Sequence, residues 1–198
     1  PVTVLEVDQE ALDKGISVIK RNYDIQVQRG RMSEADVDKR MSLLTGTTDY
    51  KGLSSADVII EAVYENIDVK VETFKKIEAV AKPGAILASN TSGLDIDKMA
   101  EATGRPDAVI GLHFFSPANV MKLLEVVRGE NTSKETIATS MKLGRTLNKI
   151  AVLSGNAPGF IGNRMLSGYT QQAGEIILQG ATPYQVDNVL LQFGMPMG

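Results

Sequence analysis

Cysteine is absent from the sequence, and histidine occurs once among its 198 residues. Without cysteine there are no disulfides, thiolate metal sites, iron–sulfur clusters or cysteine nucleophiles. A single histidine also excludes a metal site that needs several imidazoles. No apolar run approaches the roughly 18 residues that cross a bilayer, and the opening residues Pro1–Val4 do not resemble a signal peptide. We therefore predict a soluble protein of a reducing compartment, with no bound metal and no membrane partner.

An excess of charge of one sign is also lacking. Lys and Arg total 21 and Asp and Glu total 24, which gives a net charge of −3. A mildly acidic surface argues against nucleic-acid binding as the main role. Hydrophobic residues make up 43% and charged residues 23%, a composition typical of globular proteins rather than disordered ones. At about 150 residues per domain, the length indicates one domain, or one large and one small.

Strand and helix patterns alternate along most of the chain. Short apolar runs mark strands, and apolar residues about three or four positions apart mark helices. We expect strands at 1–7, 43–48, 57–63, 86–89, 108–113, 123–127 and 150–153. Helical periodicity occurs at about 12–23, 33–44, 68–82, 95–102 and 132–147. This alternation predicts an α/β protein with a doubly wound, mostly parallel sheet.

The last part of the sequence loses the strand pattern. Beyond Gly159 we expect only helices, at 160–178 and 183–192, the second with Thr182 as N-cap. Ser33 is the expected N-cap of an earlier helix, and a capping box at Thr132 is expected to open another. We place the domain boundary after residue 155. The predicted domains are an α/β domain at 1–155 and the beginning of a helical domain at 156–198.

Asp8 ends the first predicted strand and enters a helix. In nucleotide-binding α/β folds a carboxylate at this place binds both ribose hydroxyls and selects NAD over its 2′-phosphorylated relative. An ordinary helix N-cap explains Asp8 equally well. The expected glycine-rich phosphate loop, about 20 residues before such an acid, is missing, because no two of the 18 glycines form Gly-x-Gly. Either that loop lies outside this sequence, or the fold does not bind a dinucleotide.

His113 lies at the carboxyl end of the strand at 108–113, where open α/β sheets bind ligands. The alternative is a core histidine bonded to the backbone. Glu125 interrupts the apolar run at 123–127, and a carboxylate inside a buried strand is costly unless it is paired. Pairing with the only histidine would hold the imidazole in one tautomer. The alternative for Glu125 is a strand edge in water, and the residues alone leave both choices open.

Other polar residues gather at the ends of predicted elements. Asn90–Gly93 follow the strand at 86–89, and Asn156–Arg164 open the helical tail. Turn and cap chemistry explains these clusters as well as a binding site does. Glu65 and Lys70 could equally form a pair at a helix start on the surface.

Four motifs occur in a definite order and spacing: Leu87–Ser92 (LASNTS), Gly111–Pro117 (GLHFFSP), Leu124–Val127 (LEVV) and Pro158–Arg164 (PGFIGNR). Together they resemble the NAD-dependent L-3-hydroxyacyl-CoA dehydrogenase family. The phrase Asn119–Leu124 (NVMKLL) resembles the dehydrogenase part of multifunctional fatty-acid β-oxidation enzymes. The similarity extends over essentially the whole chain.

The resemblance implies oxidation of L-3-hydroxyacyl-CoA to 3-oxoacyl-CoA with NAD, on a Rossmann-like domain followed by a helical one. It implies that His113 is the general base and that Glu125 orients it. Ser92 and Asn163 would hydrogen-bond the substrate near the reacting carbon. The implied cofactor site is lined by Asp8, Val63, Glu65, Lys70, Ser92 and Ser116. Ser116 stands where many members of the family have asparagine.

The resemblance also implies an acyl-CoA substrate and a homodimer in the full-length protein. It places the protein in the cytoplasm, or in a peroxisome or mitochondrion of a eukaryote. We expect the chain to be a piece truncated at both ends, lacking its first strand and glycine loop, and inactive by itself. The missing strand would lie between 1–7 and 57–63. We expect this gap either to close by repacking or to be filled by a strand from another chain.

Two other functions remain open. One is a β-hydroxyacid dehydrogenase that uses a lysine base, and activity on a free 3-hydroxy acid would favour it. The other is a truncated, non-catalytic scaffold or interaction domain, which the missing glycine loop would explain. Turnover by the chain as given distinguishes the scaffold from the enzymes.

Overall fold

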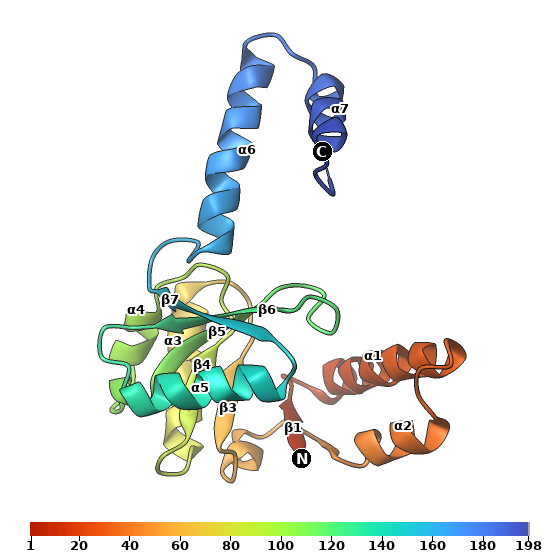
Figure 1. Ribbon diagram of the computed structural model, residues 1–198. Helices are drawn as coiled ribbons and strands as arrows, with labels where there is room; N and C mark the ends of the chain where they lie inside the picture. Colours follow the sequence, from red (N-terminus) through yellow and green to blue (C-terminus); the bar gives the residue numbers. More distant parts are fainter. Residues whose placement is uncertain (198) are drawn as a thin grey trace.

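The computed structural model describes residues 1–197, so Gly198, the last residue of the predicted helical domain, lies outside the described residues. Figure 1 shows an α/β body, with α1 and α2 beside it near β1 and with α6 and α7 extending away from it. The elements are β1 (Val2–Leu5), α1 (Gln9–Gln28), α2 (Glu34–Met41), β2 (Leu44–Thr47), η1 (Tyr50–Leu53), β3 (Val58–Glu61), α3 (Ile67–Val80), β4 (Ile86–Ser89), α4 (Ile96–Glu101), η2 (Pro106–Ala108), β5 (Val109–Phe114), β6 (Leu123–Arg128), α5 (Lys134–Thr146), β7 (Ile150–Gly155), α6 (Gly162–Leu178) and α7 (Pro183–Phe193).

The main sheet has five strands in the order β3-β4-β5-β6-β7. β3, β4 and β5 are parallel, β6 is antiparallel to β5, and β7 is parallel to β6. β1 and β2 form a separate parallel pair. The predicted α/β fold, with a mostly parallel sheet followed by helices, is confirmed. Along residues 1–197 no helix is both long and apolar enough to cross a membrane.

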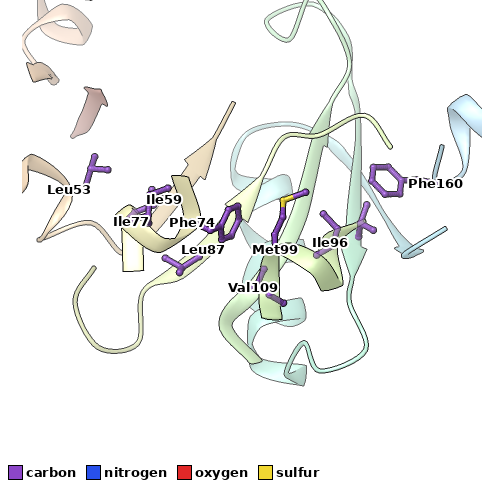
Figure 2. Close-up of a cluster of buried hydrophobic side chains, with 11 residues drawn as sticks. Leu53, Ile59, Phe74, Ile77, Leu87, Ile96, Met99, Val109 and Phe160 are labelled. Carbon is purple, nitrogen blue, oxygen red and sulfur yellow. The ribbon is translucent and has the colours of Figure 1, made fainter. Parts of the chain in front are cut away.

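Apolar side chains cover both faces of the sheet, which is why β4 and β5 are continuously apolar rather than alternating. On one face Leu87 and Val109 join a buried cluster with Phe74 of α3 and Met99 of α4, shown in Figure 2. The other face contributes Ile86, Ala88, Ile110 and Leu112, which pack against α5. Successive residues of one strand therefore enter opposite cores, and this fixes the face on which each polar side chain emerges.

Closure of the gap beside β3 by repacking, one of the two expected outcomes, is wrong. Within the described chain β1 pairs only with β2, and β3 pairs only with β4. Leu5 of β1 already packs against the buried cluster that contains Phe74 and Leu87, called here the first core cluster. The helix α1 packs on β2. Repacking would have to move this whole block and give up those contacts. Entry of a strand from another chain stays a prediction.

Two of the three helix N-termini predicted from capping residues agree with the structure. Ser33 and Thr182 are the N-caps of α2 and α7, as predicted, and each also forms a complete capping box. The expected capping box at Thr132 is wrong, because Ser133 is the N-cap of α5. The Thr132 hydroxyl is occupied elsewhere: it donates to the Val109 carbonyl and accepts from the Gly129 N–H.

The turn that leads into α6 has an unusual backbone. Gly159 and Phe160 have φ values of 71° and 50°. A left-handed conformation is ordinary for glycine but costly for phenylalanine. The Phe160 side chain is buried in the first core cluster (Figure 2), which holds this conformation in place. The turn thereby fixes where α6 begins relative to the sheet.

Candidate active site

His113 and Glu125 face each other across β5 and β6, where they are directly paired in the antiparallel register. Their side chains lie on one face of neighbouring strands, close enough to interact. The distance from His113 Nδ1 to Glu125 Oε2 is 2.7 Å. Exposed fractions of 6% for His113 and 1% for Glu125 rule out the alternative of Glu125 at a strand edge in water.

Glu125 is held from its second oxygen as well. Oε1 accepts hydrogen bonds from the Ile161 and Gly162 N–H groups at 3.0 and 2.8 Å. These are among the unsatisfied donors at the start of α6, whose own N-cap residue provides no side-chain bond. A buried carboxylate with donors on both oxygens is compensated. Glu125 therefore joins the sheet to α6.

The same contacts define the state of the imidazole. Because a carboxylate can only accept, His113 Nδ1 carries a proton, and in the neutral imidazole Nε2 is then the acceptor. Among the described residues His113 Nε2 has no hydrogen-bond partner. It is also not one of the fully buried side-chain atoms that lack a partner. The exposed part of this largely buried ring therefore includes Nε2. A core histidine bonded to the backbone does not fit this arrangement.

Aromatic side chains hold the imidazole ring. The Phe115 centroid lies 4.4 Å and the Phe160 centroid 5.9 Å from the His113 centroid, both tilted. Gly162 lies close beside them: a Cβ atom there would be 2.9 Å from Phe115 Cζ, so a larger residue would push the Phe115 ring aside. The ring of His113 is thus restrained by its hydrogen bond and by packing.

Ser92 and Asn163, which the resemblance places near the substrate, are in contact. Asn163 Nδ2 donates to the Ser92 carbonyl at 3.1 Å. Asn90 Oδ1 accepts from the Phe114 N–H at 2.9 Å, which ties the loop after β4 to β5 beside His113. Gly162 and Asn163, adjacent in α6, therefore link the His–Glu pair to the Ser92 loop.

Glu65 binds the same loop from the end of β3. Its Oε1 accepts from the Thr91 hydroxyl at 2.6 Å, the Ser92 N–H at 2.9 Å and the Ser92 hydroxyl at 3.1 Å. Burial raises the pKa of Glu65, but the hydrogen bonds from Thr91 and Ser92 and the nearby Lys70 ammonium together hold this pKa below its usual range. Glu65 is thus favoured as a carboxylate.

We expect the contribution of Glu65 to depend on pH. A carboxyl group whose pKa is lowered by folding stabilises the fold above its unfolded pKa, and this stabilisation is lost as the pH falls through the folded pKa. Glu65→Gln should therefore unfold at lower urea than the wild type at neutral pH, and the difference should shrink below about pH 4. The control is Glu101→Gln, because the Glu101 side chain is exposed and makes no hydrogen bond or ion pair with any of residues 1–197. A difference for Glu65→Gln that stays constant down to acid pH would contradict this assignment.

The alternative that Glu65 and Lys70 form a pair on the surface at a helix start is wrong for Lys70, which is buried. Its side chain is 1% exposed, and its ammonium contacts Glu61 Oε1 at 2.6 Å and Glu65 Oε2 at 3.3 Å. Sequence reasoning missed Glu61, although an acid in the apolar run 57–63 is the same signal that marked Glu125. Val63 is exposed, and its N–H donates to Glu61 while its carbonyl accepts from Lys70.

The remaining predicted site residues lie apart from these contacts. Asp8 is the N-cap of α1 and accepts from the Ala11 N–H at 2.8 Å, so the alternative of a helix cap is fulfilled. Its exposed position after β1 also leaves the second carboxylate oxygen without a recorded partner among residues 1–197. Ser116 is exposed in the loop after β5.

The fold and the site place the chain in the class of Rossmann-like α/β proteins with a buried His–Glu pair on neighbouring strands of the sheet. Residues 1–157 match the model of the 3-hydroxyacyl-CoA dehydrogenase NAD binding domain, and residues 159–198 match that of the C-terminal domain. The chain belongs to the 3-hydroxyacyl-CoA dehydrogenase family.

Relatives support this membership. The chain is 43% identical over 198 residues to the peroxisomal fatty acid beta-oxidation multifunctional protein MFP2 of Arabidopsis thaliana, covering 100% of this chain and 27% of that protein. It is 43% identical over 197 residues to the peroxisomal bifunctional enzyme of Danio rerio, with the same coverage of 100% and 27%. The crystal structure of (S)-3-hydroxybutyryl-CoA dehydrogenase PaaH1 from Ralstonia eutropha has a TM-score of 0.97 and 35% identity, covering 100% of this chain and 70% of that chain. The chain thus spans about a quarter of the length of these curated relatives.

The described residues fit the ribose of NAD better than its diphosphate. The exposed Asp8 carboxylate, just after a parallel strand, suits ribose hydroxyls. Glu65 and Ser92 present a carboxylate and a hydroxyl at the end of the neighbouring sheet. Backbone amides of a glycine-rich loop usually bind the diphosphate, and the sequence contains no Gly-x-Gly.

Proposed function

We propose that the protein carrying this chain oxidises L-3-hydroxyacyl-CoA to 3-oxoacyl-CoA with NAD⁺. The observation that carries the proposal is the His113–Glu125 pair, with Nδ1 bound to the carboxylate and Nε2 reaching solvent at the edge of the sheet. Family membership supplies the substrate class and the cofactor.

The residues of the chain have distinct roles in this reaction. His113 Nε2 takes the proton of the substrate's 3-hydroxyl as that group becomes a ketone. Glu125 keeps the other nitrogen protonated, so that Nε2 stays an acceptor. Ser92 and Asn163 hold the substrate near the reacting carbon, while Asp8, Val63, Glu65, Lys70 and Ser116 form or support the cofactor site. NAD⁺, when bound, supplies the hydride acceptor.

The test compares two substrates in the complete protein that carries this chain. NADH formation should occur with L-3-hydroxyacyl-CoA and be weak with the free 3-hydroxy acid. The reverse preference would favour the β-hydroxyacid dehydrogenase with a lysine base. Lys70 is a poor candidate for that base, because its ammonium is buried against Glu61. Absence of turnover with either substrate would favour the scaffold.

The 198-residue chain by itself should bind NAD weakly. Each missing hydrogen bond from a loop amide to the charged diphosphate removes about 1.5–3 kcal/mol, or roughly ten- to a hundredfold in Kd. Calorimetric titration should give a far lower affinity than for the same chain preceded by a strand and a Gly-x-Gly-x-x-Gly loop. Equal affinities would show that the described residues bind the diphosphate in another way.

We also propose a homodimer, and a cytoplasmic location or a peroxisomal or mitochondrial one in a eukaryote. Exposed apolar side chains on α6 and α7, such as Met165, Leu178, Val189 and Phe193, support an assembly through the helical part. The relatives include peroxisomal proteins and a bacterial fatty acid oxidation complex subunit.

A further inference from the structure

Glu61 is a buried acid that the proposed reaction does not use. It is the last residue of β3 and is 3% exposed. Its Oε1 accepts from the Lys70 ammonium at 2.6 Å and from the Val63 N–H at 2.7 Å, and its Oε2 accepts from the Ser89 hydroxyl at 2.7 Å. A carboxylate so fully bonded is rigid, and it joins the ends of β3 and β4 to α3.

Lys70 continues this chain of contacts toward the site. Besides Glu61, its ammonium contacts the Val63 carbonyl at 3.2 Å and Glu65 Oε2 at 3.3 Å. Glu65 uses its other oxygen for Ser92. The ammonium therefore sits between two carboxylates, one buried behind it and one facing the substrate loop.

The orientation of the Ser92 hydroxyl follows from this arrangement. Glu65 has only acceptor oxygens, so the hydroxyl must donate to it. The Ser92 hydroxyl proton is thereby fixed on Glu65, and the single proton of the substrate hydroxyl is left for His113 Nε2. If Glu65 moved, the Ser92 hydroxyl would lose this acceptor, and its orientation beside the substrate would no longer be fixed.

We propose that Glu61 is a positioning residue for Ser92, acting through Lys70 and Glu65. The proposal rests on the proposed function, because it assumes that Ser92 contacts the hydroxyacyl substrate. Glu61 holds Lys70, Lys70 holds Glu65, and Glu65 holds the Ser92 hydroxyl and N–H. A purely structural ion pair is the competing explanation, and it predicts effects on stability alone.

Variants of the complete protein separate the two explanations. Glu61→Gln removes the charge that faces Lys70 and should lower kcat/KM for the hydroxyacyl substrate by about ten- to a hundredfold, the size typical of residues that orient site groups. Because a buried ammonium left poorly paired can unfold the protein, the second variant is Glu61→Gln with Lys70→Met. It leaves no unpaired charge in the buried core, and Glu65, whose side chain is partly exposed, keeps its hydrogen bonds from Thr91 and Ser92, so the variant should fold normally. Its activity should remain as low as that of the single variant.

A double-mutant cycle with Ser92→Ala gives the decisive readout. If Glu61 acts through Ser92, Glu61→Gln should change kcat/KM little once Ser92 is alanine, whereas independent effects multiply. The matched control is Glu72→Gln, which breaks an exposed ion pair with Lys76 on the same helix and should leave activity unchanged. The proposal would be overturned if the effects of Glu61→Gln and Ser92→Ala on kcat/KM multiply. It would also be overturned by wild-type activity in the variant with Glu61→Gln and Lys70→Met.

An NMR measurement on the chain does not depend on turnover. The Ser92 N–H is hydrogen-bonded to Glu65 Oε1 at 2.9 Å, and its resonance should move in Glu61→Gln with Lys70→Met but not in Glu72→Gln. An unmoved Ser92 resonance in the folded double variant would contradict the positioning role. Full turnover in His113→Gln would instead refute the proposed function, so the two failures are distinguishable.

Discussion

Replacement of His113 by glutamine should lower kcat for 3-hydroxyacyl-CoA oxidation by about 10²–10⁴-fold, the usual worth of a positioned general base. Glutamine can occupy the space between Phe115 and Phe160 and hydrogen-bond to Glu125, so the fold should survive. It has no nitrogen that can take a proton from the alcohol. Affinity for NAD should be nearly unchanged, because the residues proposed for the cofactor lie on other elements.

Steady-state kinetics of the complete protein measures kcat, and equilibrium titration measures the affinity for NAD. Phe115→Leu serves as the control for altered packing, since it removes the aromatic contact with His113 but leaves the base in place. It should lower kcat far less than His113→Gln does. A His113→Gln variant with wild-type kcat would remove the basis of the proposed function.

Much of the main sheet could be predicted because its central strands are buried on both faces. β4 and β5 read as short, uninterrupted apolar runs, and their predicted positions agree closely with Ile86–Ser89 and Val109–Phe114. Caps made within a few residues, such as Ser33, were also predictable. Thr132 was not, because its hydroxyl bonds to the distant carbonyl of Val109. The residues next to Thr132 do not show that a distant carbonyl competes with the helix for its hydroxyl.

The site shows the same division between local and distant information. A lone acid in an apolar strand made pairing of Glu125 with the only histidine one of two open choices, and the structure shows the pair. The bonds from Ile161 and Gly162 to Glu125 could not be predicted, because they depend on the left-handed turn at Gly159 and Phe160. Glu61 carried the signal of a buried acid too, but its partner, Lys70, looked like an ordinary helix residue.

The hydrogen bonds of Glu125 predict a second large effect on kcat, that of the substitution Glu125→Gln. The Ile161 and Gly162 N–H groups need an acceptor, so the glutamine carbonyl should turn toward them. Its NH₂ group then faces His113 Nδ1, which must give up its proton and accept. The imidazole proton moves to Nε2, and Nε2 can no longer take a proton from the substrate.

The expected result of Glu125→Gln is a fall in kcat of about 10²-fold or more with little loss of stability, since the comparable change in a serine protease triad costs about 10⁴ through the wrong tautomer. Because the chain has one histidine, its imidazole ¹⁵N resonances report the tautomer directly. Glu125→Ala is the matched comparison. It leaves the two N–H groups unpaired, so it should lower stability as well as kcat. Wild-type kcat in Glu125→Gln, or an unchanged tautomer, would show that Glu125 does not orient His113.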